Sequence, residues 1–149
     1  MAVTQHVYAN ASLNALSGVI NYPSDTIYIA LVTAAYTPNQ STDAFWAAVV
    51  ANEVANGNGY VTNGKLLGTK TLAVASLVAT IGAANPAAWT ASSTGFAAAY
   101  AVIYDRTPGT DATRPLIAYI DFGATKTLVA TDTLTVTFNA SGIGTWTVS

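Results

Sequence analysis

From Gly59 onward the chain consists of short β-prone runs separated by Asn, Gly, Pro and Asp, a pattern typical of an antiparallel β domain. Residues 131–138 alternate Thr with mostly apolar residues, which predicts one buried face and one neutral exposed face. The polar connection 105–115 is too long for a tight turn and predicts an exposed hairpin loop. The expected strands are 70–80, whole or broken, 96–104, 116–122, 133–139 and 145–148.

Before Gly59 the chain mixes one strand with helical patterns. Segment 26–33 is rich in β-branched and large apolar residues between turn-forming neighbours, which predicts a buried strand. Apolar residues at a weak helical spacing predict a short helix within 10–20, and Ser41 or Asp43 can cap a second helix that ends near Gly57. The apolar positions of these helices are Leu13, Leu16, Val19 and Ile20 in the first and Phe45, Trp46, Val49, Val50 and Val54 in the second.

Together these patterns predict a mainly β fold, an α+β chain with one or two short helices, built as an antiparallel β sandwich or a barrel-like domain. No linker, charge run or repeat divides the 149 residues, so we expect a single β-rich domain over 1–149. Residues 1–8 are a candidate extended arm, because an extended end of this kind can add a strand to an exposed sheet edge.

Charged residues are scarce: they make up 8% of the chain, whereas about 25% is usual for a soluble domain. Neutral surfaces associate readily because little mutual repulsion keeps them apart, so we expect a protein that is rarely alone. The net charge is −2 and the basic residues are scattered along the sequence, so they form no basic patch. We therefore expect no nucleic-acid partner. The most apolar stretch, 72–84, is shorter than the roughly 20 residues that span a bilayer, so we expect no membrane partner.

No constellation in the sequence predicts catalysis. His6 is the only histidine, cysteine is absent, and the acidic residues are spread without a metal-ligand spacing. Gly57, Asn58 and Gly59 predict a turn rather than a phosphate loop, since no Gly-Lys-Ser/Thr follows them. We therefore expect no enzyme activity, no catalytic residue, no metal site and no bound cofactor.

The candidate interface residues belong to the arm and to the loop 105–115. The loop charges can pair locally, or they can meet complementary charges on a neighbouring subunit. The candidates are Val3, His6, Tyr8, Arg106, Asp111 and Arg114.

The tryptophans and several tyrosines leave two interpretations open. They can line a platform for sugars, because aromatic faces stack on apolar sugar faces. They can equally serve as anchors of the core or of an interface. The residues concerned are Trp46, Trp89, Trp146, Tyr8, Tyr36 and Tyr60.

Three segments of the chain resemble small virion proteins of tailed bacteriophages. They are DTIYIALVT with AYTPNQ (25–33 and 35–40), YAVIYD (100–105) and PLIAYIDFG (115–123). Within that group the chain is most similar to capsid decoration, or cement, proteins, which bind the outside of a mature head.

The resemblance implies a β-rich subunit, often trimeric, that holds adjacent major capsid proteins against the pressure of the packaged DNA. It therefore implies a structural virion protein on the outer capsid surface, synthesised in the bacterial host cytoplasm. The implied partners are the major capsid protein and copies of the chain itself in a homotrimer. Two alternatives stay open: a structural component of the phage tail, and a carbohydrate-binding or adhesion module.

Overall fold

The computed structural model describes residues 3–147. Within this range lie one α-helix, two short 3-10 helices and ten strands. In chain order they are β1 (Thr4–Val7), α1 (Ala9–Leu16), β2 (Ile27–Val32), η1 (Trp46–Ala48), η2 (Val50–Asn52), β3 (Lys65–Leu66), β4 (Thr71–Ala75), β5 (Val78–Gly82), β6 (Trp89–Thr90), β7 (Phe96–Asp105), β8 (Leu116–Leu128), β9 (Thr133–Leu134) and β10 (Gly144–Thr147).

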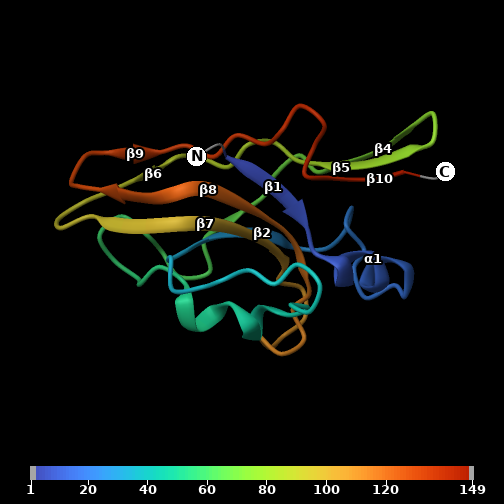
Figure 1. Cartoon of the computed structure of the whole chain (residues 1–149), viewed down its shortest axis with the longest axis horizontal. Helices are drawn as coiled ribbons and strands as arrows, with labels where there is room; N and C mark the ends of the chain where they lie inside the picture. The colour runs from blue at the N-terminus through green and yellow to red at the C-terminus, as the bar shows by residue number, and fades with distance from the viewer. Residues whose placement is uncertain (1–2, 148–149) are drawn as a thin grey trace.

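The chain is arranged in three layers (Figure 1). The middle layer is a five-stranded antiparallel sheet with strand order β1-β8-β7-β2-β3. Above it in the view lie a three-stranded sheet, β10-β5-β4, and a two-stranded sheet, β6-β9. Below it runs the connection 33–54, which contains η1 and η2. We call the three-stranded sheet the wing; it reaches past the five-stranded sheet on the side of α1.

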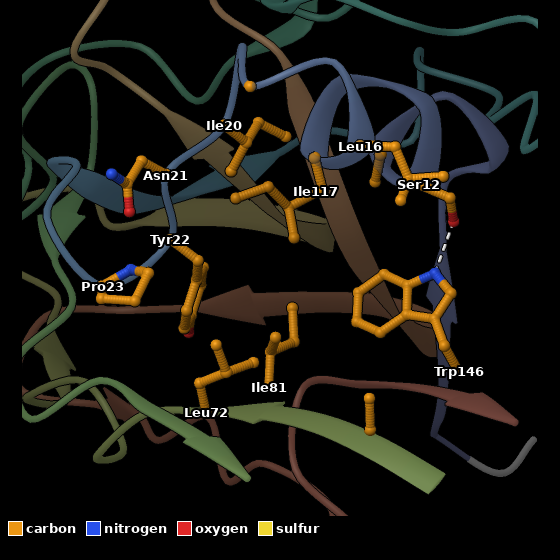
Figure 2. Close-up of a pocket in the computed structure, with 14 residues that line it drawn as sticks. Ser12, Leu16, Ile20, Asn21, Tyr22, Pro23, Leu72, Ile81, Ile117 and Trp146 are labelled. Carbon is orange, nitrogen blue, oxygen red and sulfur yellow. Dashed lines mark hydrogen bonds between the residues drawn. The ribbon is translucent and has the colours of Figure 1, made fainter. Parts of the chain in front are cut away.

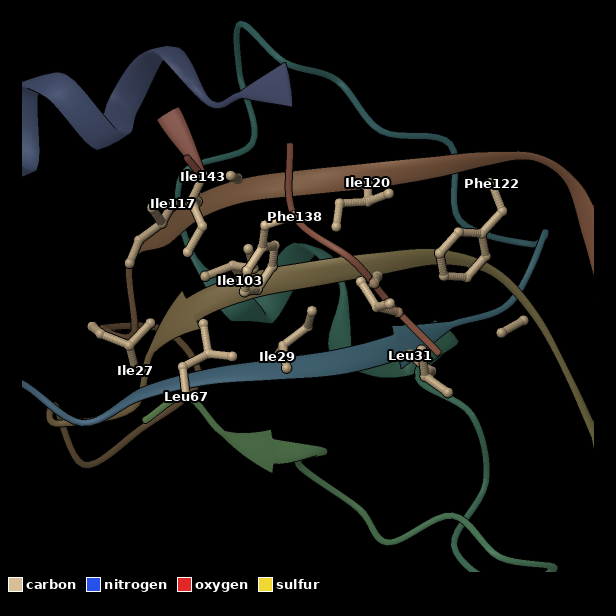
Figure 3. Close-up of a cluster of buried hydrophobic side chains, with 14 of the residues drawn as sticks. Ile27, Ile29, Leu31, Leu67, Ile103, Ile117, Ile120, Phe122, Phe138 and Ile143 are labelled. Atoms are coloured by element: carbon tan, nitrogen blue, oxygen red, sulfur yellow. The ribbon is translucent and has the colours of Figure 1, made fainter. Parts of the chain in front are cut away.

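The central strands carry apolar side chains on both faces because both faces are covered. On β2, Ile27, Ile29 and Leu31 point to one side, whereas Ala30 and Val32 point to the other. The first side packs into the main core, between the five-stranded sheet and the upper layer. Figure 3 shows this core, which also includes Ile103, Ile117, Ile120, Phe122, Phe138 and Ile143.

Trp46 anchors the layer below the sheet. Its side chain is fully buried, and its ring stacks on that of Tyr104 with 4.1 Å between the centroids. The hydroxyl oxygens of Tyr8 and Tyr36 lie 2.8 Å apart, and the Tyr36 hydroxyl donates a 2.6 Å hydrogen bond to the Asp43 carboxylate. These contacts hold the connection 33–54 against the sheet.

The prediction of a mainly β fold with a short helix is confirmed. Of the two architectures left open, the antiparallel sheets pack on one another as in a sandwich and do not close into a barrel. The expected strand 70–80 is broken: it forms the hairpin of β4 and β5 around Ser76 and Leu77. β10 ends at Thr147, and position 148 of the expected last strand lies outside the described residues.

Segment 133–139 keeps the expected alternation without forming the expected strand. Val136 and Phe138 are buried and Thr135 and Thr137 are exposed, as a two-faced segment requires. Only the residues of β9, however, join a ladder, in which they pair with β6. The segment therefore packs as a strand would, while most of its backbone lies outside the ladders.

The prediction of a helix after Ser41 or Asp43 is wrong, because that segment forms only the short 3-10 helices η1 and η2. A few 3-10 hydrogen bonds form within it, and other backbone groups bond to neighbouring segments. The Trp46 N–H donates to the Arg114 carbonyl oxygen at 2.8 Å, and the Val54 N–H donates to the Leu31 carbonyl oxygen at 2.9 Å. Packing against the sheet thus overrides a weak local helical preference.

The described part of the predicted arm lies in the molecule's own sheet. β1 pairs antiparallel with β8. The Gln5 side-chain amide donates hydrogen bonds of 2.7 and 2.6 Å to the carbonyl oxygens of Gly142 and Ile143. Residues 4–7 therefore form an edge strand, and residues 1–2 of the arm lie outside the described residues.

α1 confirms the short helix but exposes the side that its apolar spacing predicted to be buried. Its buried residues are Ala11 and Asn14. Leu13 and Leu16, by contrast, are 63% and 88% exposed. The helix thus packs through small and polar residues and leaves its leucines at the surface.

Candidate functional site

An apolar groove of about 670 Å³ lies between α1 and the wing (Figure 2). Leu16 belongs to the wall formed by α1, and Ile20 and Tyr22 belong to the segment that leads to β2. The wing forms the opposite wall with Leu72, Ala79, Ile81 and Trp146. With Ile117 of β8, which also lines the groove, four separate parts of the chain therefore meet around one hollow.

Hydrogen bonds fix the walls of the groove relative to one another. Trp146 Nε1 donates to Ser12 Oγ, which ties β10 to α1. The Tyr22 hydroxyl donates to the Gly82 carbonyl oxygen at 2.9 Å, which ties the segment before β2 to β5. After α1, Gly18 has φ of +75°, a left-handed conformation that suits glycine and turns the chain toward β2.

The wing has two different faces because its side chains alternate. Leu72 is paired with Ile81 and Val74 with Ala79, and cross-strand partners share a face, so Val74 belongs to the groove side with the other three. The opposite face carries threonines, namely Thr71, Thr80, Thr145 and Thr147. The apolar face of the wing is therefore the one that looks toward α1.

The groove offers apolar contact and no acid or base chemistry. None of its lining residues is Asp, Glu, Lys, Arg or His. Tyr22 is the ionisable group in the lining, and burial raises the pKa of its hydroxyl to about 12, so it stays neutral at physiological pH. A partner held here would be recognised by shape and by burial of apolar surface.

Large apolar side chains continue from the groove onto the surrounding surface. Leu16 is 88% exposed, Val74 is 74% exposed, and Leu77 at the tip of the β4–β5 hairpin is 62% exposed. Contiguous exposed apolar surface of this kind, beside a hollow, marks interaction sites in soluble proteins. We call the groove and these three residues the apolar surface.

The three candidate interface residues of the arm have different surroundings. Val3 is exposed just before β1. The His6 ring stacks on Tyr119 at 4.9 Å between centroids, and its Nε2 lies 3.1 Å from Thr4 Oγ1. Tyr8 is fully buried in the layer below the sheet, so its side chain belongs to the core of this chain.

The three candidates of the β7–β8 loop make contacts within the chain. Arg114 Nη1 forms a 2.6 Å ion pair with Asp111 Oδ1, and Arg114 Nε donates to the Pro108 carbonyl oxygen at 3.1 Å. The Arg106 guanidinium lies 4.9 Å from the centre of the Tyr28 ring. Of the two roles left open for these charges, local pairing is the one present in the isolated chain.

The aromatic residues that suggested a sugar platform are mostly internal. Trp46, Trp89, Tyr8, Tyr36 and Tyr60 are all buried, and Trp146 is half-buried beside the groove. Among residues 3–147, none of the large hydrophobic side chains that are exposed is aromatic.

One buried polar cluster lies apart from the groove. The Tyr60 hydroxyl donates a 2.6 Å hydrogen bond to Glu53 Oε1 and accepts one of 3.2 Å from the Leu31 N–H. Burial raises the pKa of Glu53, and the bonds from Tyr60 and the Asn63 N–H oppose that shift. The cluster joins the segment 53–63 to β2 and is a structural network.

In the described part of the chain, no three His, Cys, Asp or Glu side chains gather closely enough to hold a metal ion. Nor does that part contain a helix long and apolar enough to cross a membrane. Comparison of the chain with protein-family models, with curated proteins and with solved structures finds no match.

Sequence reasoning missed the groove because its residues resemble core residues. Leu16 and Ile20 fit a buried helical face, and the run 72–84 fits a buried strand. Residues 71–82 contain no charged side chain, but this fits a buried strand as well as the exposed hairpin that they form, so it does not identify the groove.

Proposed function

We propose that the chain is a structural virion protein of a tailed bacteriophage, which binds the outer surface of the capsid and stabilises contacts between major capsid subunits. The observation that carries the proposal is the apolar surface, a groove with exposed leucines and no ionisable side chain except Tyr22 in its lining. The resemblance of residues 25–123 to capsid decoration proteins supports the same function.

In this function the apolar surface receives an uncharged segment of the major capsid protein. Burial of Leu16 and of the groove walls drives the contact, since apolar area removed from water is the main source of association energy. Other surfaces of the chain contact further copies in a homotrimer. The protein acts in the virion, on the outer capsid surface, after synthesis in the bacterial host cytoplasm, and it uses no cofactor and performs no catalysis.

An apolar contact of this kind has a recognisable response to salt. Screening weakens attraction between exposed charges, but it leaves burial of apolar surface largely unaffected. Binding to heads should therefore persist at 1 M NaCl. A steep loss of binding at that salt concentration would instead indicate that charged residues such as those of the β7–β8 loop make the contact.

Purified particles provide the direct test. Virions made with and without the gene for this chain are compared by mass spectrometry and by cryo-electron microscopy. We expect the chain in complete particles and an added density on the outside of the head that the deletion removes. Absence from purified particles would refute the proposal, and density in the tail would favour the tail component.

The carbohydrate-binding alternative has one structural observation in its favour, the position of Trp146 beside the groove. A platform normally offers an open aromatic face, whereas this ring is half-buried and its Nε1 is already bonded to Ser12. Binding on a glycan array that is lost in Trp146→Ala would favour this alternative over the capsid function.

A further inference from the structure

β4 is an edge strand without the usual protection against pairing. All five of its residues are exposed. Natural edge strands are commonly short, or carry Lys or Pro, because an open edge invites another strand. β3, an edge of the five-stranded sheet, has only two residues, one of them Lys65. β4 is longer and contains no charged residue and no proline.

The hairpin geometry shows which backbone groups of β4 face outward. The two-residue turn Ser76–Leu77 joins Ala75 to Val78, and Ser76 has φ of +55°. Such a turn closes on a hydrogen-bonded pair, and hydrogen-bonded and non-hydrogen-bonded pairs then alternate along the ladder. The N–H and C=O groups of Leu72 and Val74 therefore point away from β5, toward the open edge.

We propose that β4 pairs with β4 of a second copy of this chain, antiparallel and about a two-fold axis at Ala73. In this register Leu72 faces Val74 of the second copy, and the two residues exchange both backbone hydrogen bonds. Ala73 faces its own copy as a non-hydrogen-bonded pair. The two wings then form one six-stranded sheet.

Charge favours a second copy over another partner as the occupant. A two-fold axis places each side chain near its own copy, so a charged edge would repel itself. Residues 71–82 contain no charged side chain. An edge evolved to receive a different chain is free to carry charges that complement that partner, and β4 carries none.

The side chains are compatible with the same register. Leu72 and Val74 are 59% and 74% exposed, and both lie on the groove face. Pairing places Leu72 against Val74 of the second copy, and Val74 against its Leu72, so both side chains become shielded from water. The two grooves then join along one apolar face. Ala73, at the axis, is small enough to lie opposite itself.

The area that the edge contact buries sets its strength. A five-residue strand buries less than the roughly 800 Å² per partner of a stable interface. The pair should therefore form reversibly as concentration rises. It is separate from the homotrimer proposed above, and in a shell it would connect neighbouring trimers.

The absence of cysteine from the chain permits a direct test of the register. Ala73→Cys places a single thiol on the axis, where paired Cα atoms lie about 4.5 Å apart, within the span of a disulfide of about 4.4–6.8 Å. Thr71→Cys is the matched control, because position 71 is also exposed and lies on the same face of the same strand. Its copies would lie roughly 13 Å apart, too far for a disulfide.

We expect mild oxidation to link Ala73→Cys into covalent dimers roughly tenfold or more faster than Thr71→Cys. Equal rates for the two variants, or no dimer of Ala73→Cys at concentrations where the wild-type mass rises, would overturn the proposal. If the copies associate through another surface, the wild-type mass would rise while Ala73→Cys formed no covalent dimer.

Sedimentation of proteins without engineered cysteine gives a second measurement. The mean mass of the wild-type protein should rise with concentration, to a dimer where free chains pair and to larger assemblies where trimers, with three β4 edges each, pair. Val74→Lys should abolish this rise because it places two charges at the edge. Val61→Lys is the control, since Val61 is 69% exposed outside the wing. A rise in mass that survives Val74→Lys would refute the edge contact. Because capsid heads are absent from both measurements, their failure would leave the capsid function standing.

Discussion

Leu16→Ala gives the most direct test of the apolar surface. Leu16 closes α1 and is 88% exposed, so its side chain contributes little to the folded core. Alanine is the best helix former, and the helix should therefore be preserved. We expect the free energy of unfolding to change by less than about 0.5 kcal/mol, the usual range for surface substitutions.

The loss in binding follows from the area that the partner would cover. Full burial of a leucine side chain is worth about 1.5–3 kcal/mol, and nearly all of this side chain is available to a partner because 88% of Leu16 is exposed. Truncation to alanine removes most of that area. The binding free energy should weaken by about 1.5–2.5 kcal/mol, which is roughly a 10- to 60-fold increase in the dissociation constant.

The assay measures binding of labelled protein to phage heads that lack it, with unfolding followed in parallel by urea denaturation. Val129→Ala is the control, since Val129 is 60% exposed and is not among the residues that line the groove. We expect wild-type affinity for the control. Wild-type affinity for Leu16→Ala, or an equal loss in both variants, would show that the groove does not contact the head.

Three further substitutions test the account of the fold. Trp46→Ala should lower the free energy of unfolding by about 3–5 kcal/mol, because the ring is fully buried against Tyr104. Gly95→Ala should cost at least about 2 kcal/mol, because φ is +76° and the added Cβ would lie 1.8 Å from the Leu128 carbonyl oxygen. Asp105→Asn should flatten the loss of stability that we expect as the pH rises above the ordinary pKa range of an aspartate.

The pH effect follows from the direction of the pKa shift. Burial raises the pKa of Asp105, the hydrogen bonds from Thr107 oppose this, and the charge of Asp25 adds to it. A carboxyl group with a raised pKa contributes stability below its unfolded pKa and loses it as pH rises through the folded value. Glu53 shifts in the same direction, so Asp105→Asn should reduce the pH dependence and leave part of it.

Urea denaturation measures the free energy of unfolding of all three variants, and a different result would contradict each prediction. Gly109→Ala is the matched control for Gly95→Ala, since the added Cβ would meet no atom within 4 Å. Equal stabilities for those two variants would refute the close approach of β7 and β8. An unchanged pH profile in Asp105→Asn would show that this carboxyl group does not drive the effect, and a small loss in Trp46→Ala would contradict its role as an anchor.

The sequence predicts this fold best where burial and local preference agree. β2 is apolar on both faces and β-branched, and both properties indicate the buried strand that forms. In segment 46–54 they disagree: the apolar spacing is helical, but Trp46 bonds to the β7–β8 loop and Val54 bonds to β2. No local pattern in the sequence records those distant bonds.

The candidate groove was beyond prediction for a related reason. Apolar spacing shows that Leu13 and Leu16 share one side of a helix, but it does not show whether this chain or another covers that side. Here Ala11 packs inward and Leu16 faces out.

The hydrogen bonds between Gln5 and residues 142 and 143 also bear on how the molecule reaches its native state. They join positions 137 and 138 residues apart, and β10, the last of the described strands, completes the wing by pairing with β5. Contacts of such long range slow folding. On the ribosome, the wing and the seam beside β1 must therefore stay open until about residue 147 emerges, and early proteolysis should cut there first.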